Sequence, residues 1–284
     1  MLLLPIKTRR IIPGDDIANV LLESAEGSDF RASDIIVISS KAIATAEGRI
    51  VDLSKLTPRD DATKLAEECQ RSPAFCEAVL EEAERRHGIV CGTCPGAILT
   101  ELRPHGLPSG SLFTANAGLD ESNTEQGTAV GWPRDPVRSA RILRQQLKEQ
   151  MREKGKGVRT EERYQPFSLS PYPFSPHLAV IITDSCVRPR RWGVTAFALT
   201  VAGIDPLKDE AGREDLFGRK LRITKEAIAD QLATAANMLM GNADQAIPAV
   251  IVRDHGLALS DYEGWVPGIE PEEDLFRGAI RKGF

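Results

Sequence analysis

Short runs of apolar residues recur along the chain, and segments with helical periodicity lie between them. Four runs are nearly continuous and rich in β-branched residues: 34–39, 178–183, 194–203 and 248–253. Such runs are typical of strands that other layers of the protein cover on both faces. In the N-terminal sequence MLLLPIKTRR the apolar run precedes the basic residues, which predicts a first strand and not a signal peptide.

Three helices are predicted from capping residues and from the apolar faces that follow them. Ser72-Pro73 and Asp135-Pro136 each offer an N-cap followed by a proline in the first helical turn. Thr224 predicts the cap of a third helix, which we expect to end at Gly241. The apolar faces comprise Cys76, Val79, Leu80 and Ala83 in the first helix, Val137, Ala140, Leu143, Leu147 and Met151 in the second, and Ile228, Leu232, Ala235 and Leu239 in the third. Strands that alternate with helices predict an α/β or mixed α+β fold.

The length of 284 residues is enough to bury one large core or two intertwined ones. We therefore expect residues 1–284 to form a single domain, with room for two intertwined lobes. Residues 152–177 differ from the rest, because they are charged and glycine-containing at first and then rich in proline and serine. This composition predicts a long inserted surface loop.

Composition narrows the class of function. Hydrophobic residues make up 42% and charged residues 27% of the chain, a balance typical of globular proteins. The net charge of -5 argues against a general nucleic-acid binder, and no run approaches the roughly 20 apolar residues that cross a membrane. The five cysteines are loosely spaced and odd in number, which favours a reducing compartment over a disulfide framework. We therefore expect a cytoplasmic protein.

Asp184 and Ser185 directly follow the apolar run 178–183. Ligands of open α/β sheets collect at the carboxyl ends of strands. A carboxylate and a hydroxyl at such a position are hard oxygen ligands, suited to Mg²⁺ or Mn²⁺. From these two residues alone, a turn or helix cap is the alternative.

A second group of oxygen-bearing side chains follows the flexible Gly118 and comprises Asp120, Ser122 and Asn123. The group predicts a magnesium or manganese ligand beside a polar contact, since the glycine and glutamate offsets of a calcium loop are not met. An Asx-turn is equally compatible with these residues.

Basic residues near the predicted strands could neutralise a triphosphate. They are Lys7, Arg9 and Arg10, which follow the first strand, and Lys41, which follows the run 34–39. Solvated surface positions are the alternative for each of them. The chain contains neither a GxxxxGK[ST] loop nor a GxGxxG fingerprint, so a nucleotide site would be neither of the Walker nor of the Rossmann type.

Cys91 and Cys94 form one CxxC pair, which could be redox-active or supply half of a zinc site. The chain has no second CxxC, and incidental or buried thiols are the alternative.

Seven segments occur together in one order: PIKTRRIIPGDDI, DIIVISSKAIATAEGRI, TANAGLDESN, VIITDS, RWGVTAFALTVAGI, DLFGRKLRITKEAIADQLATAANMLMG and IPAVIVR. They are spread over residues 5–253 and leave the segment 152–177 outside. In this combination the chain resembles the coenzyme F420:L-glutamate ligase family, also called coenzyme F420-0 γ-glutamyl ligases. GWPRDP and RWGVTAFAL resemble more closely still a bacterial branch of folate-type γ-glutamate ligases.

The resemblance implies a GTP-dependent ligase that adds L-glutamate by an amide bond to the carboxylate of coenzyme F420-0, through an acyl phosphate. It implies two divalent ions, Mg²⁺ or Mn²⁺, with K⁺ as a further candidate. It also implies an intertwined two-lobed homodimer with a mixed sheet flanked by helices. The expected partners are small molecules and a second copy of the chain, with neither nucleic acid nor a membrane. A folate or another carboxylate cofactor is the alternative acceptor.

The resemblance also assigns roles to residues. Asp120 and Asp184 would be catalytic and would bind metal together with Ser185 and Asn242. The nucleotide pocket would comprise Thr8, Arg9, Arg10, Ile11, Ser40, Lys41, Thr45, Asn123, Met240, Gly241, Asn242, Ala243, Asp244, Gln245, Ala246 and Ile247.

Three residues depart from the family pattern. Thr45 stands where a lysine usually contacts the nucleotide, Asn242 where a glutamine or glutamate usually binds metal, and Val187 where a glycine is usual. Asn242 is one methylene shorter than glutamine, so it can bind metal only if its loop lies further inward. A degenerate member that binds a nucleotide or cofactor without transferring phosphate is therefore a second hypothesis. A redox role for Cys91 and Cys94 is a third.

Overall fold

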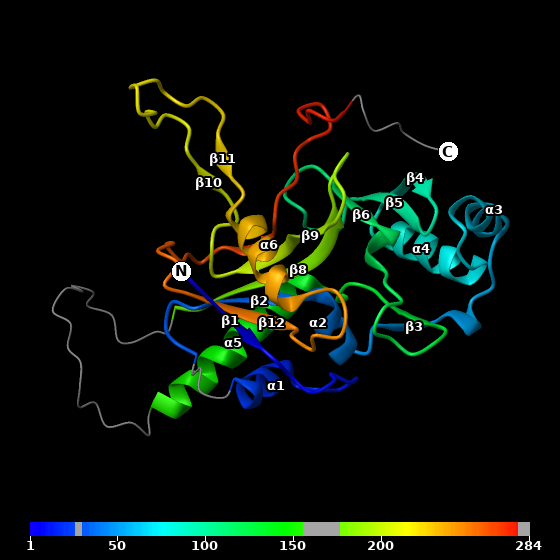
Figure 1. Ribbon diagram of the computed structural model, residues 1–284, viewed down its shortest axis with the longest axis horizontal. Coiled ribbons are helices and arrows are strands. Elements are labelled where there is room, and N and C mark those ends of the chain that lie inside the picture. The colour runs from blue at the N-terminus through cyan, green and yellow to red at the C-terminus, as the bar shows by residue number, and fades with distance from the viewer. Residues whose placement is uncertain (26–29, 156–176, 278–284) are drawn as a thin grey trace.

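Six strands form the central sheet in the computed structural model, which describes residues 1–25, 30–155 and 177–277 (Figure 1). In spatial order they are β1 (Leu2–Ile6), β12 (Ala249–Arg253), β2 (Ile35–Ser39), β8 (Ala179–Val187), β9 (Val194–Ala202) and β13 (Glu263–Trp265). Strands β2 and β8 pair in parallel, and the other neighbours pair antiparallel. Helices cover the sheet, so the predicted strands and the mixed α+β fold class are confirmed.

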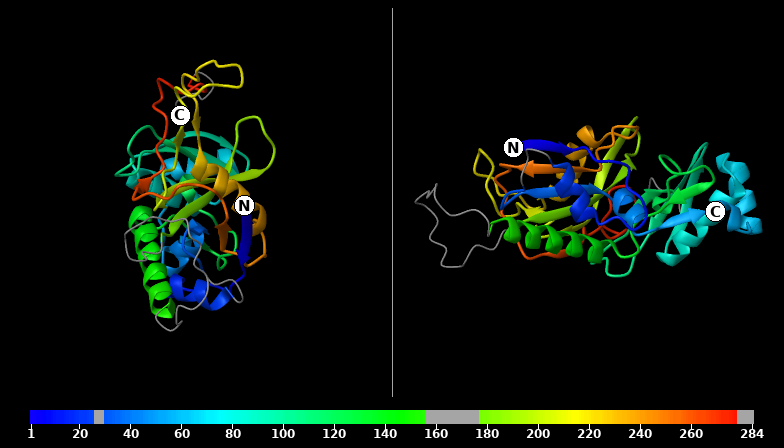
Figure 2. Two further views of the ribbon diagram at one scale, coloured as in Figure 1. Left: turned by 90° about the vertical axis from the view of Figure 1, so that its left-hand side faces the viewer. Right: turned by 90° about the horizontal axis from the view of Figure 1, so that it is seen from below.

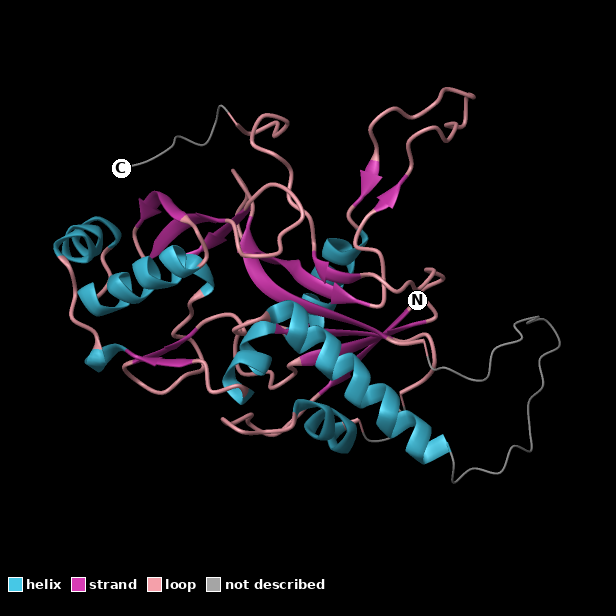
Figure 3. Cartoon of the chain, turned by 180° about the vertical axis from the view of Figure 1, so that it is seen from behind, coloured by secondary structure: helices cyan, strands magenta, loops and turns pink. Residues whose placement is uncertain are grey.

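Helices lie on both faces of this sheet (Figure 3). They are α6 (Ile228–Met240) on one face, and α1 (Ile17–Ser24) and α5 (Pro136–Gly155) on the other. Successive side chains of a strand point to opposite faces. Accordingly, Ile35 and Val37 pack in the apolar cluster with α6, whereas Ile36 and Ile38 pack in the cluster with α1 and α5. Because both faces of these strands are buried, their amino-acid sequences are nearly continuous apolar runs.

A smaller lobe lies at one end of the molecule (Figure 2). It contains α3 (Asp60–Cys69), α4 (Pro73–Arg85) and an antiparallel sheet of β4 (Ile89–Cys94), β5 (Ala97–Leu102) and β6 (Leu112–Ala115). Phe75 and Ile98 of this lobe belong to the same buried cluster as Ile38 and Ile182 of the central sheet. The lobe and the central sheet therefore share one core.

Short elements connect the lobe to the sheet and extend from the body. They are α2 (Ser40–Ala46), β3 (Ile50–Asp52) paired with β7 (Thr128–Val130), and the 3-10 turns Leu53–Lys55 and Asn116–Gly118. Strands β10 (Lys208–Asp209) and β11 (Lys225–Glu226) pair at the base of an arm, residues 208–226. This arm stands away from the body (Figure 1).

Local capping signals predicted two of the three helix starts correctly. The Ser72 hydroxyl accepts a hydrogen bond from the Phe75 amide at 3.2 Å, and the Asp135 carboxylate accepts one from the Arg138 amide at 3.0 Å. The cap predicted at Thr224 is wrong, because α6 begins only at Ile228. The Thr224 carbonyl instead accepts a hydrogen bond from the Glu210 amide, at the base of the arm.

The helix α6 ends at Gly241, as predicted, with a backbone φ of 68° at that residue. The loop predicted over 152–177 begins later than expected, because α5 continues to Gly155. The part of that loop between 156 and 176 lies outside the described residues. Within the described part of the chain, no helix is long and apolar enough to cross a lipid bilayer.

A buried ion pair joins β2 to β12. Arg253 donates from Nε and Nη2 to the two carboxylate oxygens of Asp34, at 2.8 and 2.7 Å. Both side chains are almost fully buried, and Asp34 also accepts from the Arg31 amide at 2.7 Å. A pair in this setting is costly to break, because removing one partner leaves the other charge in an apolar surrounding.

We expect the Asp34→Ala variant to lose about 3–5 kcal/mol of unfolding free energy, measured by urea denaturation, because the Arg253 charge stays buried without its carboxylate. Asp61→Ala is the control, since the Asp61–Lys64 pair is exposed and separated by 3.7 Å. It should change stability by less than about 0.5 kcal/mol. Equal losses in both variants would contradict the importance of the buried pair.

Candidate functional site

A cavity of about 910 Å³ lies at the end of the parallel pair β2 and β8. Its lining comes from five segments that are far apart in the sequence: 8–13, 39–50, 120–130, 183–185 and 237–248. A position beyond the carboxyl end of parallel strands is where open α/β sheets bind ligands. We refer to it as the catalytic-site cavity.

Nearly all residues of the predicted site line this cavity. They are Thr8, Arg9, Arg10, Ile11, Lys41, Thr45, Asp120, Asn123, Asp184, Ser185, Met240, Gly241, Asn242, Ala243, Asp244, Ala246 and Ile247. Two others do not line it. Ser40 is buried at the start of α2, and the Gln245 side chain accepts a hydrogen bond from the Ala243 amide at 2.9 Å. Val187 lies on β8 beyond the cavity and is exposed.

Asp120 is held by Lys41 and Ser122. Its carboxylate accepts from the Ser122 amide at 2.8 Å and from the Ser122 hydroxyl at 2.7 Å, and it forms an ion pair with the Lys41 ammonium. Burial acts to raise the pKa of Asp120, but the charge and hydrogen bonds of Lys41, together with Ser122, lower it overall. The Asx-turn considered from the sequence is therefore formed, and its carboxylate still faces the cavity.

Asp184 has a different environment. Its carboxylate accepts a hydrogen bond from Trp132 Nε1 at 2.5 Å and from the Ser185 amide at 2.8 Å. Burial raises the pKa of Asp184 to about 6, although the bonds from Trp132 and Ser185 oppose this rise. The charges of Lys41 and Asp120 also act on Asp184, in opposite directions. The two carboxylates predicted to act together therefore belong to one electrostatic unit.

The loop 241–247 closes one side of the cavity. The Ser185 hydroxyl donates to the Asn242 side-chain oxygen at 3.3 Å, and the Asn123 amide nitrogen donates to the Ala243 carbonyl at 2.9 Å. The Thr8 amide donates to the Ala246 carbonyl at 2.9 Å. The side chain of Asn242 therefore contacts Ser185, and two further hydrogen bonds hold this loop at the cavity.

The two arginines of the predicted nucleotide pocket differ in their pairing. Arg9 makes two hydrogen bonds of 2.7 Å to Asp15, and these bonds lower the pKa of Asp15 to about 2. Arg10 lies 3.8 Å from Glu125 and is largely exposed. The charge of Arg9 is therefore matched by a carboxylate, whereas Arg10 pairs only loosely at the edge of the cavity.

The donor set suits a hard cation. Asp120, Asp184, Ser185 and Asn242 all present oxygen atoms, which Mg²⁺ and Mn²⁺ prefer. Within the described ranges no group of three or more His, Cys, Asp or Glu residues could hold a metal ion. An ion in this cavity would therefore depend on the hydroxyl and amide oxygens and on oxygens of a bound ligand. At this end of the cavity the Lys41 ammonium already pairs with Asp120.

Sequence reasoning assigned no role to Trp132, although it lies in the segment GWPRDP. The indole is fully buried, and it reaches Asp184 because Gly118 leaves space. Gly118 has a backbone φ of 79°, and a Cβ there would lie 2.4 Å from Trp132 Nε1. The glycine therefore serves both the turn expected from the sequence and this close approach.

The cysteines lie apart from the cavity. Cys91 and Cys94 are on β4 in the smaller lobe and do not line the cavity, and their redox role stays a prediction. The sequence predicted Cys76 on the apolar face of a helix but did not pair it with Cys69, and the two buried sulfur atoms lie 3.6 Å apart between α3 and α4. Burial raises the pKa of Cys76 to about 12, so its thiol is protonated at neutral pH.

Comparisons with known proteins agree on one family. The family model described as F420-0:Gamma-glutamyl ligase matches residues 5–169 and 173–254. The coenzyme F420:L-glutamate ligase of Methanopyrus kandleri is 37% identical over 273 residues, which are 95% of this chain and 94% of the relative. That of Methanothermobacter thermautotrophicus is 35% identical over 282 residues, 93% and 94% of the two chains. That of Archaeoglobus fulgidus is 34% identical over 273 residues, 95% and 93%.

Replacing Asp184 and replacing Asp120 should change the stability of the fold in opposite directions. The pKa of Asp184 in the folded protein lies near 6, above the ordinary value near 4. The protonated carboxyl therefore stabilises the fold at low pH, and this contribution is lost progressively as pH rises from about 4 to about 6. Metal-free Asp184→Asn should therefore be more stable than the parent at pH 7.5, by on the order of 1–2 kcal/mol, and equally stable near pH 4.

Asp120→Asn is the matched control for this prediction. The pKa of Asp120 is lowered, so its ionised form stabilises the fold at neutral pH. This variant should be less stable than the parent at pH 7.5, and the loss should fade as pH falls below the ordinary range of aspartate. Thermal unfolding at several pH values measures both effects. If Asp184→Asn were destabilised at pH 7.5, the buried, high-pKa environment of Asp184 would be wrong.

Proposed function

The chain belongs to the F420-0:gamma-glutamyl ligase family, and on that premise we propose that it joins L-glutamate to the carboxylate of coenzyme F420-0 at the expense of GTP. The observation that carries this proposal is the convergence of Asp120 and Asp184 on one cavity with Lys41. Two carboxylates and a cation around one space are what a phosphoryl-transfer site requires.

The residues of the cavity suggest how the reaction proceeds. Lys41 and Arg10 offer positive charge to the triphosphate, and Asn123 supports the loop 241–247 against which the nucleotide would lie. The acceptor carboxylate attacks the terminal phosphorus, and GDP leaves. The glutamate amine then attacks the acyl carbon, inorganic phosphate leaves, and the amine proton passes to solvent.

Two divalent ions, Mg²⁺ or Mn²⁺, would be held by Asp120, Asp184, Ser185 and Asn242, with K⁺ as a further candidate. Such ions would neutralise charge on the transferring phosphoryl group. Asp184 would serve as a ligand in its ionised form, which neutral pH favours because its pKa is about 6. The Trp132 N–H would keep this carboxylate in a fixed orientation.

A folate or a related carboxylate cofactor is the second candidate acceptor. The segment GWPRDP favours it, since that segment resembles the folate-type branch and contributes Trp132 directly behind Asp184. A degenerate member without phosphoryl transfer is the third candidate. Thr45 favours this reading, because it puts a neutral side chain into the cavity where a lysine is usual.

The ligase proposal predicts a product that mass spectrometry can detect. Protein incubated with L-glutamate, GTP and Mn²⁺ should add one or more glutamyl units to coenzyme F420-0. Asp184→Asn should lower the rate by at least about 10³-fold, because charge neutralisation in the transition state is lost. Asp261→Asn, an exposed aspartate outside the cavity, is the control and should retain the parent rate.

The acceptor series separates the alternatives. Product with a folate but not with coenzyme F420-0 would move the substrate assignment to the folate-type branch. Measurable GTP binding without product from any acceptor would favour the degenerate reading. ATP in place of GTP tests the nucleotide preference in the same assay.

We further propose that the chain forms a homodimer and that the arm 208–226 contributes to its interface. Leu216, Phe217 and Ile223 on this arm are almost fully exposed. Several large apolar side chains exposed on one extended segment are typical of a surface that a partner covers. A second copy of the chain fits the intertwined assembly expected from the family resemblance.

Light scattering during size-exclusion chromatography should give the mass of two chains for the parent. The Leu216→Glu/Phe217→Glu variant should shift toward one chain, because two charges would enter an apolar contact. Ile142→Glu on α5 is the control, since it adds a charge at an exposed apolar position away from the arm. A parent protein with the mass of one chain would contradict the dimer, and an unchanged variant would contradict the role of the arm.

A further inference from the structure

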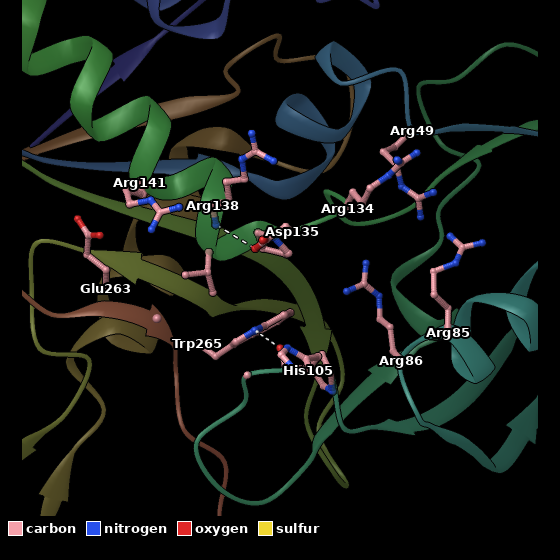
Figure 4. Close-up of a pocket in the computed structure, with 15 residues that line it drawn as sticks. Arg49, Arg85, Arg86, His105, Arg134, Asp135, Arg138, Arg141, Glu263 and Trp265 are labelled. Carbon is pink, nitrogen blue, oxygen red and sulfur yellow. Dashed lines mark hydrogen bonds between the residues drawn. The ribbon is translucent and has the colours of Figure 1, made fainter.

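A second cavity, of about 670 Å³, opens between the smaller lobe and the start of α5. Its wall includes the end of α4, the loop 104–106, residues 134–141 and β13 (Figure 4). None of the residues that line it also lines the catalytic-site cavity. We refer to it as the arginine cavity.

Positive charge dominates the arginine cavity. Its arginines are Arg49, Arg85, Arg86, Arg134, Arg138 and Arg141. Asp135 and Glu263 are the acidic residues of its lining, and His105 lies on its floor with Trp265 (Figure 4). Six guanidinium groups against two carboxylates leave a large excess of positive charge in a small volume.

Three of these arginines are fixed in place by one buried carboxylate. Glu82 accepts from Arg49 at 3.0 Å, from Arg85 at 2.7 Å and from Arg86 at 2.8 Å. Arg86 also donates to the Pro133 carbonyl at 3.2 Å. Burial lowers the pKa of Arg86, and repulsion from Arg49 and Arg85 acts in the same direction, whereas Glu82 opposes it. One carboxylate thus orders three arginines and leaves their combined charge unbalanced.

The other three arginines are exposed and lack anionic partners. Within the described part of the chain, the guanidinium groups of Arg134, Arg138 and Arg141 make no ion pair and no hydrogen bond. They lie at the N-terminal end of the 20-residue helix α5, where the helix dipole adds partial positive charge. Figure 4 shows Arg138 and Arg141 on the opposite side of the cavity from Arg85 and Arg86. Such crowding of like charges costs free energy unless an anion occupies the space between them.

We propose that the arginine cavity binds a small polyanion that carries two or more phosphate or carboxylate groups. Guanidinium groups bind such oxygens through two parallel hydrogen bonds, and here six of them line one cavity. The size of the cavity fits a small molecule. A long nucleic acid would also meet the rest of a surface whose net charge is -5.

Trp132 lies between this site and the catalytic-site cavity. The Arg86 guanidinium lies 5.0 Å from its ring centre, and the Trp265 ring centre lies 6.3 Å away. Nε1 of the same indole donates to Asp184. A polyanion bound by the arginines would therefore sit one aromatic ring away from Asp184, in a space of its own.

The test is a calorimetric titration of the full-length protein with inorganic pyrophosphate and, separately, with citrate, in a buffer that a chelating resin has freed of divalent ions. The parent should bind both probes saturably. Arg138→Ala/Arg141→Ala should lose this binding or weaken it at least about tenfold, because two guanidinium partners are removed. Both side chains are exposed and alanine favours helices, so the variant should fold, which circular dichroism checks.

Arg31→Ala/Lys64→Ala is the matched control, since it removes two exposed positive charges that line neither cavity. It should bind both probes like the parent. Equal binding by the parent and the Arg138→Ala/Arg141→Ala variant, or no saturable binding of either probe by the parent, would overturn the proposal. A 20-nucleotide single-stranded RNA that bound more tightly than pyrophosphate, and lost that binding in the same variant, would replace it with a nucleic-acid surface.

Discussion

The contact between the Trp132 indole and the Asp184 carboxylate fixes how the functional face of the protein is built. Asp184 stands on β8, a strand of the central sheet, so its backbone cannot move without disturbing the core. Trp132 is fully buried and fills the space behind it, which Gly118 leaves free. A residue smaller than tryptophan would leave a void at that position and an unsupported carboxylate. One side chain therefore orients the candidate metal ligand and separates the two cavities.

Charge is distributed unevenly in this acidic chain. The net charge is -5, yet Lys41 and Arg10 line one cavity and six arginines line the other. An acidic surface discourages polyanions in general, while local clusters of positive charge attract those that fit a confined space. This arrangement would let the protein bind the proposed anionic small molecules although its net charge is negative. The net charge describes the chain as a whole and says nothing about such local clusters.

Local patterns predicted the long strands of the central sheet and two helix starts, whereas contacts between distant residues decided other features. The Ser72 and Asp135 caps act on backbone amides three residues away, so the sequence predicts the starts of α4 and α5. Thr224 looks like an equally good cap, but its carbonyl bonds to Glu210, and no local pattern reports that pairing.

The same distinction holds for the two cavities. The position of Asp184 after an apolar run marks it as a candidate ligand, whereas the role of Trp132 depends on a contact between residues 52 positions apart. The arginine cavity joins residues between 49 and 265, which the sequence leaves scattered. Its chemistry becomes visible only when α4, α5 and β13 are placed side by side.

In the proposed ligase, Thr45 and Asn242 would belong to a nucleotide pocket that is rearranged rather than lost. Lys41 and Thr45 are four residues apart on α2 and line the same cavity, so a lysine at 41 offers its charge one helical turn from the usual place. Asn242 is short, yet its amide oxygen lies 3.3 Å from the Ser185 hydroxyl, and Asn123 bonds to the next residue of the same loop. Lys41 thus lies beside Thr45, and Ser185 beside Asn242, on the wall of the same cavity. Under the ligase proposal, the cavity keeps a lysine and an amide oxygen beside both carboxylates, which is the chemistry that a metal-bound triphosphate would need.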